Sequence, residues 1–436
     1  AFVLVYEAGL ISRDTRLVNW DVEARTVLSD LEVETEEGVQ GELFEFAYPL
    51  DGGGEVVVAT TRPETMLGDT ALAVHPDDAR HKHLLGKHAV HPILERRVPI
   101  VGDAELVDPE FGTGVVKVTP AHDFNDFATG KRHGLEVISV LAPDGTANEH
   151  AGPFAGLERG ALREAVKARL AELGLVRGVK PHTMTLPRSQ RTGTVVEPMI
   201  STQWFVKMAP LAEPAIEAVR SGAIRFLPEE WTKTYDHWME NIQDWCISRQ
   251  LWWGHRIPVW YRNGADRDDP ANWHVGHAPP ADADHWAQDE DVLDTWFSSG
   301  LWPFSIMGWP EETPEQDHFY PTSYLSTGPD IIFFWVARMI MSGLYFKGEI
   351  PFKTVFFHPM VVDEHGKKMS KTKGNVLDPL TLKDDYGIDA LRFTLASGAS
   401  KGKDLRLSLT SVDSHRKFLN KVWNAARFAL GHLEGF

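Results

Sequence analysis

The sequence contains a single cysteine, Cys246, in 436 residues. One thiol excludes a disulfide framework within the chain and any zinc site that needs two or more cysteines. A lone cysteine is typical of a reducing compartment, so we expect a cytoplasmic protein. We expect neither a structural zinc nor another protein-bound metal.

Long hydrophobic runs are also absent. The longest apolar run, residues 331–341, is interrupted by Arg338. It is far shorter than the ~20 residues that a helix needs to cross a bilayer. The first residues show no signal-peptide pattern. We therefore expect no membrane-embedded segment.

Positive charge is scarce, because 44 Lys and Arg residues stand against 62 Asp and Glu residues, for a formal net charge of −18. This balance argues against a uniformly basic nucleic-acid-binding protein, although a local basic face remains compatible with RNA. Hydrophobic residues make up 43% of the chain. A chain of this length and composition can form two or three domains with substantial cores.

One short loop runs against the negative charge. Residues 367–375 read KKMSKTKGN, after a strand-like stretch at 354–362 and before a helical run at 380–397. Lysine ammonium groups and backbone N–H groups in such a loop can bind a polyphosphate such as ATP. A charge run by itself is more often a solvated surface loop, so charge alone does not decide.

A β-rich module interrupts the chain. Strand patterns at 42–48 and 55–60 flank a turn at 51–54, and a strand at 114–119 and a helix at 161–173 follow. From residue 207 the chain returns to long helical stretches rich in tryptophan. We therefore expect residues 38–195 to be a domain inserted into another domain.

Two polar stretches lie in this module. Residues 60–65 read TTRPET, and residues 117–126 read KVTPAHDFND. Hydroxyls and an arginine suit a carboxyl or ribose group, and the two aspartates could bind an ammonium group. Both stretches could instead simply cap the next helix, and their spacing alone favours capping.

The lysine loop resembles the KMSKS signature of class I aminoacyl-tRNA synthetases. The resemblance implies ATP, with Mg²⁺, as a substrate, and makes Lys371 the lysine that stabilises the triphosphate. Thr372 stands at the last serine of the signature and keeps its hydroxyl. The residues implied in catalysis are Lys371, Lys368 and Ser370, and those implied in ATP binding are Lys371, Met369 and Thr372.

The two polar stretches resemble the editing domain of the valyl, isoleucyl and leucyl members of this class, which hydrolyses mischarged tRNA. Asp126 would then bind the amino group of the wrong amino acid. Phe124 stands where proline is expected. The implied editing residues are Thr60, Thr61, Arg62, Thr65, Phe111, Lys117, Asp123 and Asp126.

Two further segments resemble the valyl branch of the family. They are LWWGHRIP, within residues 245–258, and DIIFFWVARM, at residues 330–339. By residue type alone, the first could be core packing with snorkelling arginines or an RNA surface, and the second reads as a buried helix. The resemblance implies a valine pocket formed by Trp296, Asp330, Ile331 and Trp335. Pro329 and Pro359 depart from the pattern.

The fold class implied is α/β, with a split Rossmann-like catalytic domain, an inserted β-rich editing domain and the start of an α-helical anticodon-binding domain. The expected ranges are 1–37 for the end of the first catalytic half, 38–195 for the editing domain, 196–408 for the second catalytic half, and 409–436 for the helical start. An amphipathic pattern at 411–430 predicts the helix that opens this last part.

The sequence lacks the His-x-Gly-His tetrad of class I synthetases, so we expect a central fragment of such an enzyme. The implied partners are the tRNA for valine, valine and ATP, without an obligate protein partner. The whole enzyme would join valine to tRNA through valyl-adenylate and hydrolyse mischarged threonyl-tRNA, and we expect this fragment to retain only the hydrolysis. An isoleucyl enzyme and a stand-alone deacylase or tRNA-binding module remain alternatives.

Overall fold

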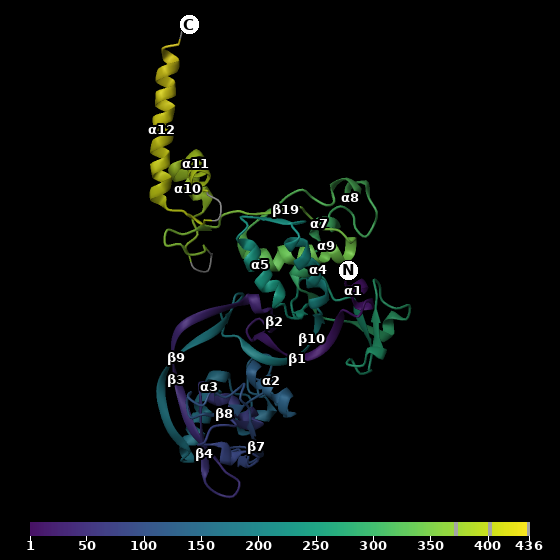
Figure 1. Ribbon diagram of the computed structural model, residues 1–436, viewed down its shortest axis with the longest axis vertical. Helices are drawn as coiled ribbons and strands as arrows, with labels where there is room; N and C mark the ends of the chain where they lie inside the picture. The colour runs from purple at the N-terminus through teal and green to yellow at the C-terminus, as the bar shows by residue number, and fades with distance from the viewer. Residues whose placement is uncertain (370–373, 400–402, 434–436) are drawn as a thin grey trace. The chain divides into compact units, whose positions relative to one another are not determined.

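The computed structural model describes residues 1–369, 374–399 and 403–433 (Figure 1). The chain is a mixed α/β protein with several sheets, as expected. It forms two compact units. Unit 1 comprises Ala1–Val206 and Trp245–Asp294, and unit 2 comprises Lys207–Asp244 and Thr295–Phe436. The four-part division expected from the sequence remains a prediction.

Unit 1 begins with helix α1 (Phe2–Glu7) and a four-stranded antiparallel sheet. The order of the sheet is β12 (Trp245–Cys246), β10 (Glu197–Val206), β1 (Ile11–Asp21) and β2 (Thr26–Leu28). Trp204 of β10 is buried, lies edge-on to the Phe2 ring at 5.6 Å, and donates its indole N–H to Asp289 at 2.9 Å. The sheet thus joins segments more than 180 residues apart, since Ile11 pairs with Val206.

A long antiparallel ribbon extends from this sheet. It consists of β4 (Glu55–Thr60), β3 (Val33–Pro49) and β9 (Val176–Ser189), and Figure 1 shows β3 and β9 running side by side. The predicted hairpin is confirmed, because β3 pairs with β4 from Phe44–Thr60 to Pro49–Glu55. Gly52, Gly53 and Gly54 all have positive φ, which explains the run of glycines in the turn.

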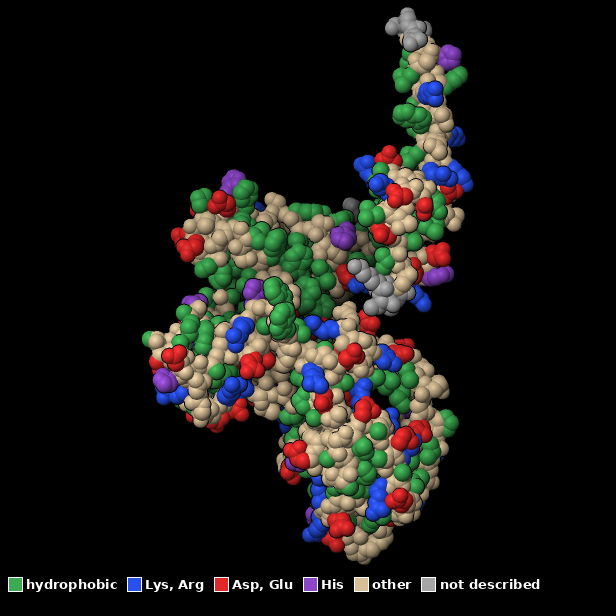
Figure 2. Space-filling view, turned by 180° about the vertical axis from the view of Figure 1, so that it is seen from behind, with side chains coloured by type: hydrophobic (Ala, Val, Ile, Leu, Met, Phe, Trp, Pro, Cys, Tyr) green, Lys and Arg blue, Asp and Glu red, His purple; other side chains and the backbone are tan. Residues whose placement is uncertain are grey.

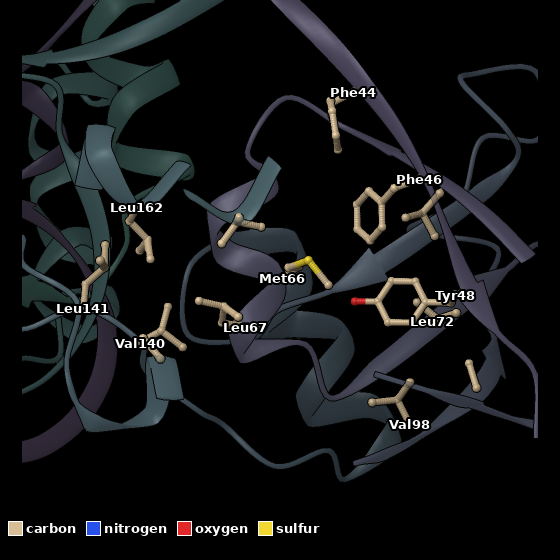
Figure 3. Packing of buried hydrophobic residues seen from close by; sticks show 14 of the residues in the cluster. Phe44, Phe46, Tyr48, Met66, Leu67, Leu72, Val98, Val140, Leu141 and Leu162 are labelled. Atoms are coloured by element: carbon tan, nitrogen blue, oxygen red, sulfur yellow. The ribbon is translucent and has the colours of Figure 1, made fainter. Parts of the chain in front are cut away.

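A second sheet has the order β6 (His88–Val90), β7 (Arg97–Gly102), β5 (Ala71–Val74) and β8 (Val115–Val118). The 3₁₀ helix η2 (Pro63–Gly68) and helices α2 (Phe124–His133) and α3 (Arg159–Glu172) pack around it. Phe46, Met66 and Leu67 are fully buried in its core, together with Tyr48 and Leu72 (Figure 3). This core fixes η2 and β8, the elements that carry the polar stretches.

The remainder of unit 1 is a small sheet with the order β15 (Trp273–Val275), β14 (Val259–Arg262) and β16 (Trp286–Gln288), and a short pair of β13 (Ser248–Arg249) with β17 (Val292–Leu293). Short 3₁₀ turns complete it: η1 (Asp30–Glu32), η3 (Lys82–Leu84), η4 (Glu149–Phe154), η5 (Pro270–Asn272) and η6 (Ala283–His285).

Unit 2 contains a parallel sheet with the order β11 (Arg225–Leu227), β19 (Thr354–Phe357) and β18 (Leu325–Thr327). Parallel strands require crossover connections, and helices supply them here. The helices between the strands are α5 (Trp231–Glu240), α6 (Thr295–Ser299), α7 (Trp302–Ser305), α8 (Pro314–Phe319) and α9 (Arg338–Lys347). Helix α4 (Ala209–Arg220) precedes the first strand, β11.

The DIIFFWVARM segment is not the regular α-helix that its sequence predicts. It begins as 3₁₀ helix η7 (Pro329–Ile331), continues as a π-helix, η8 (Ile332–Ala337), and becomes α-helical only from Arg338. A regular face with a period of 3.6 residues therefore does not run through Asp330, Phe334 and Arg338. Among the described residues, Pro329–Lys347 is one helical stretch long and apolar enough to cross a membrane by length and composition, and 44% of its apolar window is buried inside the protein.

The last part of unit 2 contains β20 (Val361–Val362) paired with β21 (Leu405–Arg406), and helices α10 (Pro379–Tyr386), α11 (Ile388–Gly398) and α12 (Leu409–Gly431). The predicted strand at 354–362 is thus interrupted after Phe357. The predicted helical run at 380–397 is split at Gly387, whose φ of 84° ends α10.

Helix α12 confirms the amphipathic helix expected at 411–430. Within this fully described helix, Val412 alone is buried, while Phe418, Val422 and Trp423 of the apolar stripe are exposed. Figure 2 shows hydrophobic side chains along the outside of the helix. Full burial along α12 is therefore confined to its first turn, and Leu419 packs partly buried against the core of α10 and α11.

Candidate functional site

A buried polar cluster lies between η2 and β8 of unit 1. Lys117, only 6% exposed, donates to Thr65 Oγ1 at 2.8 Å, to Thr119 Oγ1 at 2.6 Å and to Asp69 Oδ1 at 3.2 Å. An ammonium group has three hydrogens, so these contacts occupy all of them. Lys117, predicted to line the editing site, is therefore held inside the module.

Asp126 lies beside this cluster. It is 7% exposed, and its Oδ2 accepts a hydrogen bond from the Thr119 backbone N–H at 2.8 Å. Burial raises the pKa of Asp126 to about 7, and Asp123 and Asp69 raise it as well, against the opposing charge of Lys117. An acid with this pKa changes charge near neutral pH, as a group that binds an ammonium ligand could.

The two predicted aspartates have different local roles. Asp123 is the N-cap of α2, and its Oδ1 accepts from the N–H groups of Asn125 at 2.8 Å and Asp126 at 3.1 Å. The capping interpretation is therefore right for Asp123. The Asp126 side chain instead reaches outside its helix to Thr119 on the strand side, so it is available to a site as well as to the fold.

Arg62, the N-cap of η2, contacts carboxylates on η2 and on β10. It donates to Glu64 at 3.2 Å, to the His122 carbonyl at 3.2 Å and to Glu197. Although burial opposes it, the hydrogen bond from Arg163 and the charges of Arg62 and Arg163 hold the pKa of Glu64 at about 2. Arg62 thus already has two carboxylate partners, and a phosphate or ribose would have to share it.

The hydroxyls of the TTRPET stretch organise this turn. Thr60 Oγ1 accepts from the Arg62 N–H at 3.0 Å, and the Thr65 hydroxyl donates to the Arg62 carbonyl at 3.0 Å. Thr61 is half-buried between them. Phe111 is 55% exposed and lies edge-on to His182 at 6.1 Å, so the structure does not bring it into the polar cluster.

His122 is the buried histidine of the KVTPAHD stretch. Burial, together with the charges of Arg62 and Lys117, lowers its pKa to about 3. Its neutral Nε2 accepts the Val140 N–H at 2.9 Å. His122 therefore joins its loop to the buried Val140, and it carries no charge near neutral pH.

In unit 2, two predicted site residues meet. Lys368 donates to Asp330 Oδ2 at 2.7 Å. Asp363 fixes the loop on both sides, because it accepts from the Lys367 N–H and from the Asn375 amide, each at 2.8 Å. The structure thus brings the start of the lysine loop to the carboxylate predicted for the valine pocket.

The other residues predicted for the lysine loop and for the valine pocket lie in several places. Met369 packs against the small core of α10, α11 and α12. Ser370, Lys371 and Thr372 lie outside the described residues. Trp296 stacks on Phe334 at 5.1 Å, and the Trp335 indole donates to the Ser299 carbonyl at 3.0 Å. Ile331 is half-buried at the end of η7.

The LWWGHRIP segment is not simple core packing. Trp252 and Trp253 are 98% and 85% exposed. Arg249, just before them, is 1% exposed and donates to Asp294 at 2.8 Å and to the carbonyls of Cys246 and Ser248 at 2.9 Å each. The arginine is therefore a buried structural cation, and the tryptophans project outward.

Sequence reasoning missed three polar residues of the cluster: Asp69, Thr119 and Tyr48. The available signal was Asp69 itself, an acidic residue two positions before the buried apolar run of β5, because a carboxylate buried there needs partners. Within residues 1–369, 374–399 and 403–433, no three His, Cys, Asp or Glu side chains are grouped as a metal site.

We expect Asp126→Asn to change how stability depends on pH. An unfolded Asp has a pKa near ~3.9, whereas Asp126 in the fold titrates at about 7. The folded state therefore holds its proton more tightly, and the stability that this proton provides below pH ~4 is lost as pH rises to 7. Asparagine removes this dependence and can still accept the Thr119 N–H.

Thermal denaturation at pH 5 and pH 8 measures this effect. From pH 5 to pH 8 the wild type should lose stability that the variant keeps. The difference in the free energy of unfolding should change in favour of the variant by on the order of 1 kcal/mol or more, since one pKa unit corresponds to about 1.4 kcal/mol. Asp77→Asn, at an exposed position of the same unit, is the control and should follow the wild type. Parallel pH profiles for wild type and Asp126→Asn would contradict the assignment.

Comparison with known proteins gives the following matches. The model of the family described as tRNA synthetases class I (I, L, M and V) matches residues 1–408. Similar curated proteins include the valine–tRNA ligases of Anoxybacillus flavithermus, 54% identical over 438 residues, and Bacillus subtilis, 53% identical over 437 residues. Each match covers 100% of this chain and 49% of the relative, so the chain spans about half the length of these relatives.

Solved structures are similar at a lower level. The ternary complex of Agrobacterium radiobacter K84 LeuRS, tRNA and LeuAMS has a TM-score of 0.43 and 19% identity, and covers 100% of this chain and 60% of that chain. Mycobacterium tuberculosis methionyl-tRNA synthetase with methionyl-adenylate has a TM-score of 0.40 and 21% identity, and covers 52% and 40%. The family model, which extends over residues 1–408, carries the assignment: this chain belongs to the class I tRNA synthetases (I, L, M and V).

Proposed function

We propose that the chain is part of a valine–tRNA ligase, which uses ATP to attach valine to its tRNA through valyl-adenylate. The observation that carries this proposal is the identity of 53–54% to valine–tRNA ligases over the whole chain. The partners are then valine, ATP with Mg²⁺ and the tRNA for valine. The single cysteine supports a cytoplasmic location.

The geometry of unit 2 supports an activation site. Asp330 provides a carboxylate for the valine ammonium, and Lys368 at 2.7 Å is a cation that the ammonium would replace. Trp296 and Trp335 offer apolar ring surfaces for a small aliphatic side chain. Lys371, outside the described residues, has the role of stabilising the triphosphate as pyrophosphate leaves.

The polar cluster of unit 1 supports a second reaction, hydrolysis of threonyl-tRNA. An apolar pocket rejects an isosteric amino acid with one extra hydroxyl poorly, and valyl-tRNA synthetase is itself the established example of this limit. A separate site must therefore remove threonine. In our proposal Asp126 binds the substrate ammonium, and the Thr60–Thr65 turn positions the ester for attack by water.

Two assays test the proposal. With the protein from its full reading frame, valine should support exchange of pyrophosphate into ATP, and isoleucine should support it far less. Exchange driven best by isoleucine would make the protein an isoleucyl enzyme. The absence of exchange with every amino acid, together with threonyl-tRNA hydrolysis, would leave a stand-alone deacylase.

The second assay uses the 436-residue chain with threonyl-tRNA and valyl-tRNA, both carrying the valine tRNA. The chain should deacylate the threonyl form faster. Equal rates for the two forms, or no hydrolysis of either, would contradict the editing function without affecting the ligase proposal.

A further inference from the structure

The hydrolysis proposed for unit 1 needs a cation for the phosphates at the 3′ end of the tRNA, because these must lie close to the polar cluster. Lys117 is buried, and its three ammonium hydrogens already bind protein oxygens. Each nitrogen of the Arg62 guanidinium likewise donates to a protein acceptor. A phosphate therefore needs a further cation beside the cluster.

Arg163 of α3 is such a cation. Its Nε and Nη2 donate to the two carboxylate oxygens of Glu64 at 2.8 and 2.9 Å, and Glu64 directly precedes Thr65 of the cluster. Within the described part of the chain, Arg163 Nη1 makes no hydrogen bond. The side chain is 39% exposed, so the edge of the guanidinium opposite Glu64 is accessible to a ligand.

The sequence of α3 explains how Arg163 is presented. Leu162, Val166 and Leu170 form the buried face of the helix, and Leu162 lies in the core shown in Figure 3. Arg163 follows Leu162 and is rotated from it by about 100°, so it lies at the edge of the buried face. At such an edge the apolar stem packs against the protein while the charged end reaches the surface. The helix fixes the backbone of Arg163, and Glu64 fixes its guanidinium.

Charge also favours an anion here, because Arg163 ends a row of alternating ion pairs. The row consists of Arg163, Glu64, Arg62, Glu197 and Arg159. Both glutamates are buried, and Glu64 stays ionised with a pKa of about 2. Three arginines and two glutamates leave one excess positive charge within the row. Glu158 approaches only the far end, 3.9 Å from Arg159, and is largely exposed.

We propose that Arg163 binds a phosphate at the 3′ end of the tRNA during threonyl-tRNA hydrolysis, while Glu64 holds the guanidinium in place. This inference rests on the proposed editing function. A guanidinium has five N–H donors in a planar fork that fits a phosphate, and Glu64 uses only two of them. A phosphate contact positions the substrate and takes no part in the chemistry. Its loss should therefore change KM more than kcat.

The experiment measures kcat and KM for hydrolysis of threonyl-tRNA by the 436-residue chain, between about 50 and 200 mM salt. The proteins are wild type, Arg163→Met and Arg163→Lys. Arg163→Met should raise KM about tenfold and leave kcat nearly unchanged, because a charge-assisted hydrogen bond to the substrate is lost. The slope of log KM against log salt should also fall by about 0.7, the value for one phosphate contact on a single strand.

Arg163→Lys separates phosphate binding from support of the fold. Lysine keeps a cation beside Glu64, so a role limited to balancing that carboxylate would leave the wild-type KM and salt slope. An ammonium held by Glu64 has no second planar edge for a phosphate, so we expect KM to rise as in Arg163→Met. If Arg163→Met does not fold, Arg163→Lys decides.

Arg169→Met is the matched control on the same helix. Arg169 is exposed, pairs with Glu172 at 2.9 Å and does not belong to the row of ion pairs. This variant removes the same charge from α3 and should keep the KM and the salt slope of the wild type. An equal rise of KM here would show a general effect of charge and would overturn the site at Arg163.

The outcomes separate the two proposals. If the wild-type chain is active and Arg163→Lys matches its KM and salt slope, the inference is wrong and the editing function stands. A loss of kcat at unchanged KM in the Arg163 variants would likewise overturn the phosphate contact. An inactive wild-type chain would overturn the editing function and this inference with it.

Discussion

Replacing Arg249 by methionine is expected to destabilise unit 1 by about 3–5 kcal/mol, the usual cost of removing one partner from a buried ion pair. Arg249 is 1% exposed and pairs with Asp294 at 2.8 Å and with Glu32 at 3.4 Å. Methionine fills similar space but leaves both carboxylates without this cation. The two carbonyls that Arg249 caps would also lose a donor.

Denaturant unfolding of Arg249→Met and of a control variant, each compared with wild type, measures this loss of stability. The matched control is Arg177→Met, which removes an arginine from the partly exposed pair with Glu55 on the β-ribbon. Such a solvent-screened surface pair contributes little to stability. Similar losses for Arg249→Met and Arg177→Met would show that burial does not strengthen the Arg249 network.

Local patterns predicted those elements whose cause is local. The β3–β4 hairpin follows from strands of alternating or apolar residues on either side of three glycines that adopt positive φ. The position of α12 follows from its amphipathic repeat and its Ser408 cap. The break at Gly387 was also visible in principle, because glycine after a helical stretch is a common C-terminal signal.

The π-helical segment was not predictable in the same way. The residues from Ile332 to Ala337 are all apolar, so the sequence pattern does not distinguish an α-helical from a π-helical repeat. Only packing in unit 2, such as Trp296 on Phe334 and the Trp335 indole on the Ser299 carbonyl, distinguishes the observed conformation. Those contacts join residues 36 or more positions apart.

The polar cluster was predicted only in part for a related reason. Family resemblance indicated Thr65, Lys117 and Asp126, which lie in recognisable stretches. Asp69 depends on donors 21, 48 and 50 residues away, which lie on β3 and at the end of β8. Its role becomes visible only when β3, η2 and β8 are assembled. The burial of Asp126, which is 7% exposed, also depends on this assembly and not on the residues next to it in the sequence.

Asp126→Ala is expected to lower threonyl-tRNA hydrolysis by about a hundredfold. A hydrogen bond to a charged group contributes about 1.5–3 kcal/mol, and loss of the carboxylate removes the proposed contact to the substrate ammonium. In the wild type, hydrolysis should rise with pH through about 7, as the buried acid ionises and can pair with that ammonium. The alanine variant should lose this rise.

Burial makes a stability measurement necessary beside the rate. Alanine leaves the Thr119 N–H without its acceptor, which lowers stability, while removal of a buried charge above pH 7 raises it. These effects oppose each other at pH 8, so the thermal transition there should remain close to wild type. A hundredfold rate loss in a folded variant then reports the lost contact and not unfolding.

Asp123→Ala is the control from the same helical turn. Its side chain caps α2 and makes no hydrogen bond to Thr119, so its loss should cost about 1 kcal/mol of stability and change the rate only slightly. If Asp126→Ala hydrolyses threonyl-tRNA at the wild-type rate, the ammonium contact is not at Asp126. If Asp123→Ala instead abolishes hydrolysis in a folded chain, the substrate ammonium belongs at the N-terminus of α2, and the raised pKa of Asp126 serves the fold alone.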